Sequence, residues 1–210
     1  MEGEARSLYC AALNEETAKE WIQSLRSCIN VENYFADCAS VQSDTPIPAV
    51  VKALSDVGTK TLVIQNYTMT KHAMLALCEM LRRNKSFTKL VLQDCGLTDS
   101  FMEILGPALA QNEVIRQVDL SRNRIGNEGV ADLVDGLYIN INLTQLSLAH
   151  NVFSDVGAVY LADLLKGNVA LTHLDISNNQ IGSKGAQALA SALTINQVIV
   201  ELEMGQYVFF

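Results

Sequence analysis

The sequence predicts an α/β solenoid: a curved arc of strand–helix units with a parallel sheet on the concave side and helices on the convex side. Three observations predict this fold class. From Thr59 onward the sequence repeats with a period of 28 residues. The first half of each unit alternates apolar and polar residues, as strands do, and the second half carries an apolar stripe at helical spacing. A fixed period of this length is the signature of a repeat architecture.

Five full units align without gaps, and a sixth is truncated by the end of the sequence. The units begin at Thr59, Phe87, Ile115, Leu143, Leu171 and Ile199. The 210 residues therefore divide into a repeat region at 59–210 and a different N-terminal region at 1–58. A chain of this length is sufficient for one domain with a sizeable core.

The first half of a unit is predicted to be a strand, as the fourth unit illustrates. Leu146 and Leu148 alternate with polar neighbours and therefore point to the same side of the strand. Leu143 and Phe153 join them from either end, and Asn151 stands where the chain turns away from the strand. We expect the four apolar side chains to form the core of the unit.

The second half of a unit is predicted to be a helix. In the fourth unit, Ala158, Leu161 and Leu165 lie on one helical face. The leucine pair recurs in the other units as Leu77/Leu81, Leu105/Leu109, Leu133/Leu137 and Leu189/Leu193.

Polar residues at fixed positions predict where these helices begin and end. Before the helices, the residues predicted as N-caps are Asp99, Asn127, Asp155 and Ser183. After the helices, an asparagine recurs at Asn84, Asn112, Asn140, Asn168 and Asn196. Because asparagine tolerates the left-handed backbone conformation, we expect it to end each helix in that conformation.

The packing distances of strands and helices predict the curvature. Parallel strands lie about 4.8 Å apart, whereas packed helices need roughly 8–10 Å between their axes. Units with a strand on one side and a helix on the other therefore stack into an arc, with the strands inside. The inner face of the sheet is left open to solvent, which accounts for the polar residues between the leucines.

Residues 1–58 are predicted to form a helical N-terminal cap that includes a degenerate first repeat. Ile47, Val50 and Leu54 have helical spacing and would form the helix of a unit that begins near Val31. Before it, residues 14–29 predict an amphipathic helix that buries Trp21. Because the end units of a solenoid must cover an exposed core, we interpret 1–58 as a cap. The alternative is a separate small helix that binds a partner.

The C-terminal end has no comparable cap in the sequence. Residues 199–210, IVELEMGQYVFF, supply a strand and a turn but stop where a helix is expected. We therefore expect either a longer natural chain, which we favour because the break falls inside a repeat, or a partner at this end. A second copy, through self-association, is one such partner.

Composition excludes several classes of partner and compartment. The net charge is −8 with interspersed signs, which argues against nucleic acid or an anionic membrane as the main partner. No apolar run reaches membrane-spanning length, and the N-terminus lacks a secretory signal. Five cysteines form an odd, widely spaced set: Cys10, Cys28, Cys38, Cys78 and Cys95. Reduced thiols predict a cytoplasmic protein, with the nucleus as an alternative.

The sequence predicts no catalytic site, no metal site and no cofactor. The turn Gly-Ser-Lys-Gly at 182–185 resembles a phosphate-binding loop, but its lysine is replaced by Glu128 and Val156 at equivalent turns. His150 and His173 fall in separate units. Asp119 and Asp175 come from units two apart, roughly 10 Å by strand spacing, which is too far for direct contact. We therefore expect that the protein is not an enzyme.

Each unit reads L-x-x-L-x-L-x-x-N/C-x-L, and this pattern resembles the leucine-rich repeat, while the 28-residue length resembles its ribonuclease-inhibitor-like type. The resemblance implies a leucine-rich-repeat solenoid. It also implies that the asparagine of the pattern forms hydrogen bonds with backbone groups of its own turn and of neighbouring turns. Asn123, Asn151 and Asn179 match that position, and Cys95 is the tolerated variant. Tyr67 departs from the pattern, as does residue 207, which puts the asparagine ladder in doubt at both ends.

The concave face is the predicted binding surface, since strand residues between the buried leucines point toward it. Its charge is mixed and becomes acidic toward the C-terminal end, which suits a folded protein partner, with Arg122 and His150 as central contacts. The predicted partner-binding residues are Lys89, Gln93, Asp94, Gln117, Asp119, Arg122, Gln145, His150, His173, Asp175, Asn178, Glu201 and Glu203.

Three functions remain open from the sequence. The first is a non-catalytic protein-interaction module or scaffold that binds its partner on the concave face. The resemblance implies cytoskeletal, ciliary or centrosomal settings for such a protein, or an intracellular immune receptor. The second is a regulator of a small GTPase like the activator of the Ran cycle, in which Arg122 and Arg124 would act. The third is an enzyme inhibitor of the ribonuclease-inhibitor type.

Overall fold

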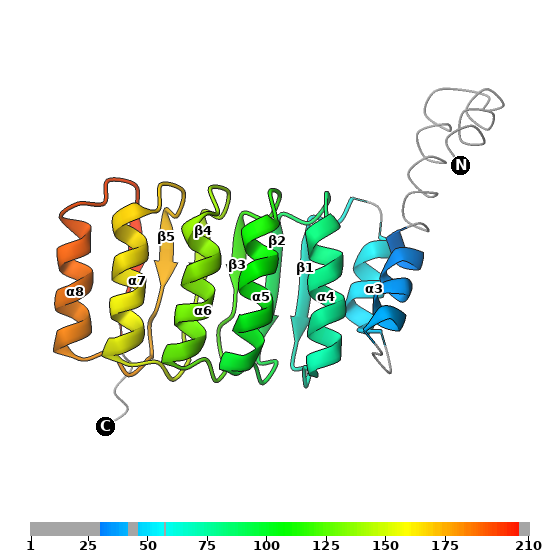
Figure 1. The fold of residues 1–210 in the computed structure, drawn as a ribbon, viewed down its shortest axis with the longest axis horizontal. Helices are drawn as coiled ribbons and strands as arrows, with labels where there is room; N and C mark the ends of the chain where they lie inside the picture. The colour runs from blue at the N-terminus through cyan, green and yellow to red at the C-terminus, as the bar shows by residue number, and fades with distance from the viewer. Residues whose placement is uncertain (1–29, 42–45, 57, 206–210) are drawn as a thin grey trace, which may run out of the picture.

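The computed structural model describes residues 30–41, 46–56 and 58–205 (Figure 1). Residues 30–40 are helical, and regular strand–helix alternation follows. The elements are, in order, α3 (Pro48–Ser55), β1 (Thr61–Gln65), α4 (Lys71–Arg83), β2 (Lys89–Gln93), α5 (Asp99–Gln111), β3 (Gln117–Asp119), α6 (Asn127–Tyr138), β4 (Gln145–Ser147), α7 (Asp155–Gly167), β5 (His173–Asp175), α8 (Ser183–Leu193) and β6 (Glu201–Glu203).

The six strands form one parallel sheet in the order β1-β2-β3-β4-β5-β6. Each strand pairs with the next at a shift of one repeat, so that Gln117 pairs with Gln145 and Gln145 with His173. Figure 1 shows helices α4 to α8 side by side in one layer in front of the strands. The predicted leucine-rich-repeat solenoid, with the sheet concave and the helices convex, is confirmed.

The predicted apolar positions form one continuous core. Leu148 and Phe153 are fully buried, and Leu146 and Leu143 are nearly so. Leu193 differs from the expectation because 37% of its surface is exposed. It lies at the end of α8, which packs against α7, and the described residues place no further helix on its other side. The consensus position is therefore buried only where a neighbouring unit covers it.

The segment before the first strand differs from the predicted repeat. Residues 30–40 are helical where a unit beginning near Val31 would have its strand. Helix α3 begins at Pro48, as its sequence indicates, and buries Val50 and Leu54. The Tyr34 hydroxyl accepts a hydrogen bond from the Ile47 N–H at 3.1 Å, which joins the two helical segments. The predicted helix around Trp21 lies outside the described residues, and the interpretation of 1–58 as a cap stays a prediction.

The predicted N-cap residues are wrong by one position. Asp99, Asn127, Asp155 and Ser183 are the first residues of their helices rather than the residues before them. The actual N-caps make no side-chain cap hydrogen bond, and two of them are glycines, Gly126 and Gly182.

The first residue of one helix instead caps the next helix. The Asn127 Oδ1 accepts the N–H groups of Ser154 and Gly157, each at 2.9 Å, at the start of α7. The Asp155 Oδ1 likewise accepts those of Gly182 and Gly185 at the start of α8, at 2.7 and 2.8 Å. The N–H groups left free by one helix are therefore satisfied by its neighbour.

The asparagines after the helices are not left-handed, contrary to the prediction. Asn84, Asn112 and Asn168 have φ values of −59°, −84° and −74°. Their side chains instead form hydrogen bonds with backbone groups. The Asn112 Oδ1 accepts the N–H groups of Val114 and Ile115, and its Nδ2 donates to the Leu81 carbonyl of the preceding unit at 2.6 Å. The same inter-unit bond recurs at Asn140, Asn168 and Asn196.

In the part of the chain that the structure describes, no helix combines the length and apolar character needed to span a membrane.

Candidate functional site: the open face of the sheet

An asparagine ladder holds the strand ends in register. The Asn123 Oδ1 accepts the N–H groups of Cys95 and Leu97, each at 3.0 Å, and its Nδ2 donates to the Leu92 carbonyl at 2.8 Å. One unit later, the Asn151 Oδ1 accepts the Ile125 N–H and its Nδ2 donates to the Leu120 carbonyl; two units later, the Asn179 Nδ2 donates to the Leu148 carbonyl. Cys95 takes part through its thiol, which donates to the Ile64 carbonyl. The role that the resemblance implied for this position is confirmed for these units.

Eight of the thirteen predicted binding residues line a shallow depression on the concave face. We call this surface, made by the outward-facing residues of β2 to β6, the sheet face. The eight residues are Lys89, Gln117, Asp119, Gln145, His173, Asp175, Glu201 and Glu203. The strands thus bring together side chains that are spread over more than a hundred residues of sequence.

The other five predicted residues lie where the strands end. Gln93 is the last residue of β2 and accepts a hydrogen bond from Gln65 at 2.7 Å. The remaining four were predicted as strand residues but lie in the turns that follow the strands. These turn residues share a left-handed backbone, with φ between 52° and 58°, and are Asp94, Arg122, His150 and Asn178.

The sheet face has a basic end and an acidic end. Lys89 stands on β2, whereas four carboxylates stand on β3, β5 and β6. The Asp119 Oδ1 accepts the Ser121 N–H at 2.9 Å. Asp175 is held more fully: its Oδ1 accepts the N–H and the hydroxyl of Ser177, and its Oδ2 accepts the Ser147 hydroxyl at 3.1 Å.

The two predicted histidines, His173 on the sheet face and His150 in the turn after β4, have different partners. One ring nitrogen of His173, Nδ1, lies 2.8 Å from the Thr172 hydroxyl, and the other, Nε2, lies 3.7 Å from the Glu201 carboxylate. His150 contacts Asn178 in the next unit, with 3.3 Å between Nε2 and Nδ2. The histidines therefore belong to separate polar pairs.

Metal ligation and thiol chemistry can be checked among the described residues. They contain no group of three or more histidine, cysteine, aspartate or glutamate side chains that could hold a metal ion. The thiols of Cys38, Cys78 and Cys95 are buried. Burial raises the pKa of Cys78 to about 12 and that of Cys95 to about 11, and it also raises the pKa of Cys38. These thiols are protonated at neutral pH and are poor nucleophiles.

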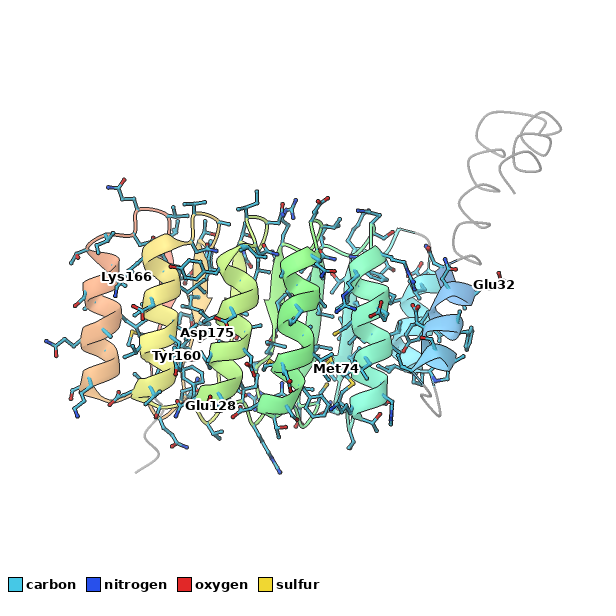
Figure 2. All side chains as sticks on the ribbon, in the orientation of Figure 1. Glu32, Met74, Glu128, Tyr160, Lys166 and Asp175 are labelled. Carbon is cyan, nitrogen blue, oxygen red and sulfur yellow. The ribbon has the colours of Figure 1, made fainter. Side chains whose placement is uncertain are left out.

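The helix side carries charges of its own. Figure 2 shows Glu128 on α6 and Lys166 on α7, while Asp175 lies on β5 behind the helix layer. Burial, followed by the negative charges of Glu103, Asp135, Glu128 and Asp99, raises the pKa of the Asp132 carboxyl. This side of the molecule is therefore also acidic between α5 and α6.

A row of exposed apolar side chains was not predicted. It runs along the edge where helices α6, α7 and α8 connect to the next strands, and it comprises Tyr138, Ile139, Ile141, Val169 and Ile195. Ile141 is the most exposed of them, at 72%. These residues fall outside the apolar positions of the 28-residue pattern. An apolar residue at a position that the pattern leaves variable is the signal that could have identified them.

The fold and the sheet face define a class: a solenoid of strand–helix repeats with an open parallel sheet. A family model described as "Leucine Rich repeat" matches residues 111–134, 140–162 and 167–190. Mouse ribonuclease inhibitor is 30% identical over 95 residues, which cover 45% of this chain and 20% of the inhibitor. The matched segments are leucine-rich repeats, and the chain is similar to ribonuclease inhibitor over the part that aligns.

A further curated relative shares part of this sequence. Human "NACHT, LRR and PYD domains-containing protein 5" is 28% identical over 121 residues, or 56% of this chain and 10% of that protein. This chain thus spans a tenth to a fifth of the length of these curated relatives.

Solved structures share the fold. A structure titled "Leiomodin-1 Actin-Binding Site 2 (ABS2)" has a TM-score of 0.55 and 18% identity, and the match covers 76% of this chain and 86% of that one. The tropomodulin C-terminal domain of Caenorhabditis elegans has a TM-score of 0.57 and 16% identity, with 77% and 91% coverage. At these identities the likeness concerns the fold alone.

Proposed function

We propose that the chain is a protein-interaction module that binds a folded protein on the sheet face and catalyses no reaction. The observation that carries this proposal is the open face itself. Parallel sheets are normally covered by helices on both faces, whereas the helices α4 to α8 of the described chain lie on one side of the sheet. The uncovered side presents a shallow depression lined by polar and charged side chains at fixed strand spacing. A surface of this kind offers a partner rigid, spaced contacts.

The chemistry of the face suits a protein partner. Lys89 on the face and Arg122 in the adjoining turn provide positive charge, and Asp119, Asp175 and Glu203 provide negative charge. Arg122 and His150 are exposed beside each other in consecutive turns, where the left-handed backbone directs the chain away from the strand. These two residues border the sheet face, and large side chains on an ordered backbone are favourable contacts because little conformational freedom is lost on binding.

The relatives suggest which kinds of partner to test. The leiomodin title names actin binding, and it supports a cytoskeletal partner as one candidate. The ribonuclease inhibitor relative supports a second candidate, the inhibition of an enzyme. Regulation of a small GTPase stays a prediction that rests on the exposed Arg122 and Arg124. The cytoplasmic location and self-association at the C-terminal end also stay predictions.

The proposal is tested by identifying a partner and then mapping it. The purified chain is used for affinity capture, partners are identified by mass spectrometry, and each is produced separately for affinity measurement. Charge reversal by Asp119→Lys with Asp175→Lys is expected to weaken binding at least about tenfold. The matched control, Lys166→Glu with Lys184→Glu on the helices, is expected to leave it unchanged. Loss of binding only in the control would contradict the proposal.

Three direct assays separate the candidate functions. Co-sedimentation with filamentous actin tests the cytoskeletal partner, inhibition of ribonuclease A tests enzyme inhibition, and stimulated GTP hydrolysis by Ran tests the GTPase regulator. If the chain is an interaction module without catalysis, it should not act as a catalyst in the GTP hydrolysis assay, which is the assay of the three that can report turnover.

A further inference from the structure

We propose that the chain has a second interaction surface, which binds an amphipathic helix whose apolar stripe is flanked by lysine or arginine residues. This surface, the apolar row, lies along the edge where helices end and strands begin, and it comprises Tyr138, Ile139, Ile141, Val169 and Ile195. None of these residues lines the depression of the sheet face. The proposal therefore goes beyond the proposed function and does not depend on it.

The repeats themselves show that the fold does not require apolar residues at these positions. Ile141 and Val169 occupy one position of the 28-residue unit, and an earlier unit has Lys85 there. Ile139 occupies another position, which holds Arg83 two units earlier. Both isoleucines are more than two-thirds exposed, at 71% and 72%, and apolar side chains stabilise a fold only when they are buried. The apolar residues of the row therefore have no role in folding that a polar residue could not fill.

The apolar side chains adjoin one another along three neighbouring units. The connections 139–144, 168–172 and 194–200 contain no charged residue. Tyr138 reaches from the end of α6 to the end of α7, because a Cβ at Gly167 would lie 3.4 Å from Cζ of the tyrosine ring. Isolated exposed apolar residues are ordinary on protein surfaces, whereas a contiguous apolar patch marks an interaction site.

The spacing of the row fits a helix laid across the ends of α6, α7 and α8. These three helices pack side by side (Figure 1). Packed helices lie roughly 8–10 Å apart, so the three ends extend over roughly 20 Å. A helix of about 14 residues covers this length, and its two-turn repeat of about 10 Å presents an apolar side chain to each end in turn.

The charges around the row select the occupant. From Asp94 to Glu203 the sequence has thirteen acidic residues against five basic ones. Asp135 is exposed one helical turn before the row, and Lys166 at the end of α7 is already paired with Asp163 at 2.7 Å. This negative surrounding attracts a basic helix, and it repels both an anionic membrane and the same acidic region of a second copy.

The other half of the same edge sets the limit of the binding surface. Lys60 and Lys85 are exposed where α3 and α4 connect to the following strands. Because like charges repel, a basic helix is confined to the ends of α6, α7 and α8.

The test uses a defined probe on the whole 210-residue chain. The probe is the amphipathic peptide Leu-Lys-Lys-Leu-Leu-Lys-Leu-Leu-Lys-Lys-Leu-Leu-Lys-Leu, with a matched peptide in which glutamate replaces every lysine. Binding is followed by amide chemical shifts in ¹⁵N-labelled protein. We expect shift changes at 138–144, 166–172 and 193–200 with the lysine peptide, and at least about tenfold weaker binding of the glutamate peptide. Shifts confined to the sheet face, or equal binding of the two peptides, would overturn the proposal.

Substitutions that copy another unit test the row without disturbing the fold. Ile141→Gln with Val169→Gln introduces the residue that the last unit has at this position, Gln197. This variant is expected to raise the dissociation constant of the lysine peptide at least about tenfold. The control, Val152→Gln with Val156→Gln, removes exposed apolar side chains from the opposite edge and should leave binding unchanged. Unchanged binding in the row variant, or an equal loss in the control, contradicts the proposal.

Two measurements test the other possible occupants. Vesicles of phosphatidylcholine and phosphatidylserine test a membrane, and sedimentation equilibrium of the chain alone tests a second copy. We expect no binding to the vesicles and the same mass for the wild-type chain and the Ile141→Gln, Val169→Gln variant. Vesicle binding, or an oligomer that these substitutions dissociate, would assign the row to a different occupant and overturn the proposal.

Discussion

The fourth unit and the last strand carry the same pattern but differ in burial. In the fourth unit, Leu146 and Leu148 are buried between neighbouring units. In the last strand, Leu202 and Met204 occupy the corresponding positions, yet both are only half-buried. Strand β6 pairs with β5 on one side, and the described residues provide no strand on its other side.

The difference teaches that a leucine at a consensus position is stabilising because of its neighbours. A repeat buries its apolar side chains only where another unit covers each side. The stability of the molecule is therefore expected to be concentrated in the interior units, and the following substitutions compare the two regions.

The largest effect is expected from the interior leucines. Leu148→Ala or Leu174→Ala removes a fully packed side chain and should lower the free energy of unfolding by about 2–5 kcal/mol. Leu202→Ala removes a half-buried side chain and should cost clearly less. Denaturant unfolding of the three variants measures the comparison. An unchanged stability in both interior variants would contradict the register of the repeats.

A smaller effect is expected from the asparagine ladders. Asn151→Ala leaves the Ile125 N–H without its partner and removes one of the two side-chain donors to each of the Leu120 and Leu148 carbonyls, and should cost about 1–3 kcal/mol. Asn196→Ala, in the less buried ladder at the last unit, should cost less because water can replace the lost bonds. Thermal unfolding measures the loss of stability in both variants. An equal loss would show that the contribution of these asparagines does not depend on their position along the array.

The cross-unit caps predict an effect at a distance from the substitution. Asp155→Ala lies on α7 but removes the acceptor of the Gly182 and Gly185 N–H groups, and should cost about 0.5–2 kcal/mol. Hydrogen exchange should become faster at the start of α8. The control is Asp163→Ala, an exposed position on α7, which should change neither the stability nor the hydrogen exchange at the start of α8. Faster exchange confined to α7 would argue that the cap acts within its own helix.

The smallest effect concerns Asp132, between the interior helices α5 and α6. Burial and nearby acids raise its folded pKa, so the folded state binds the proton more tightly than the unfolded state does. The charged carboxylate therefore costs stability at neutral pH, and this cost is relieved as the pH falls through the folded pKa. Asp132→Asn should raise stability slightly at pH 7, within about 0.5 kcal/mol, and the gain should fade in acid. Melting temperatures of both proteins across this pH range measure it, and a lower melting temperature for the variant at pH 7 would contradict it.

Much of the fold could be predicted from the sequence because the repeat pattern overdetermines it. Six copies of one spacing place Leu90, Leu146 and Leu174 in the same register, and only one arrangement buries all of them. The ends of the helices were harder to predict from the sequence. Asp155 fits an N-cap and a first helical residue equally well by type, and the choice depends on the backbone of the next unit.

The site was predictable in position but less so in conformation. Strand alternation placed Asp119 and Asp175 on the open face, where the structure has them. The left-handed turn at Arg122 could not be inferred from its residue type, because arginine has no preference for that conformation. The exposed Ile141 was missed because the repeat pattern assigns no role to its position. The helical conformation of residues 30–40 was missed because a single degenerate repeat provides no register.

Site-specific photo-crosslinking tests the central claim most directly. Benzoylphenylalanine is placed at Gln145 in the depression and, separately, at Gln187 on the exposed side of α8. With a captured partner, we expect an adduct from position 145, loss of that adduct in the Asp119→Lys, Asp175→Lys background, and none from position 187. Adducts from position 187 alone, unaffected by the charge reversal, would contradict binding on the sheet face.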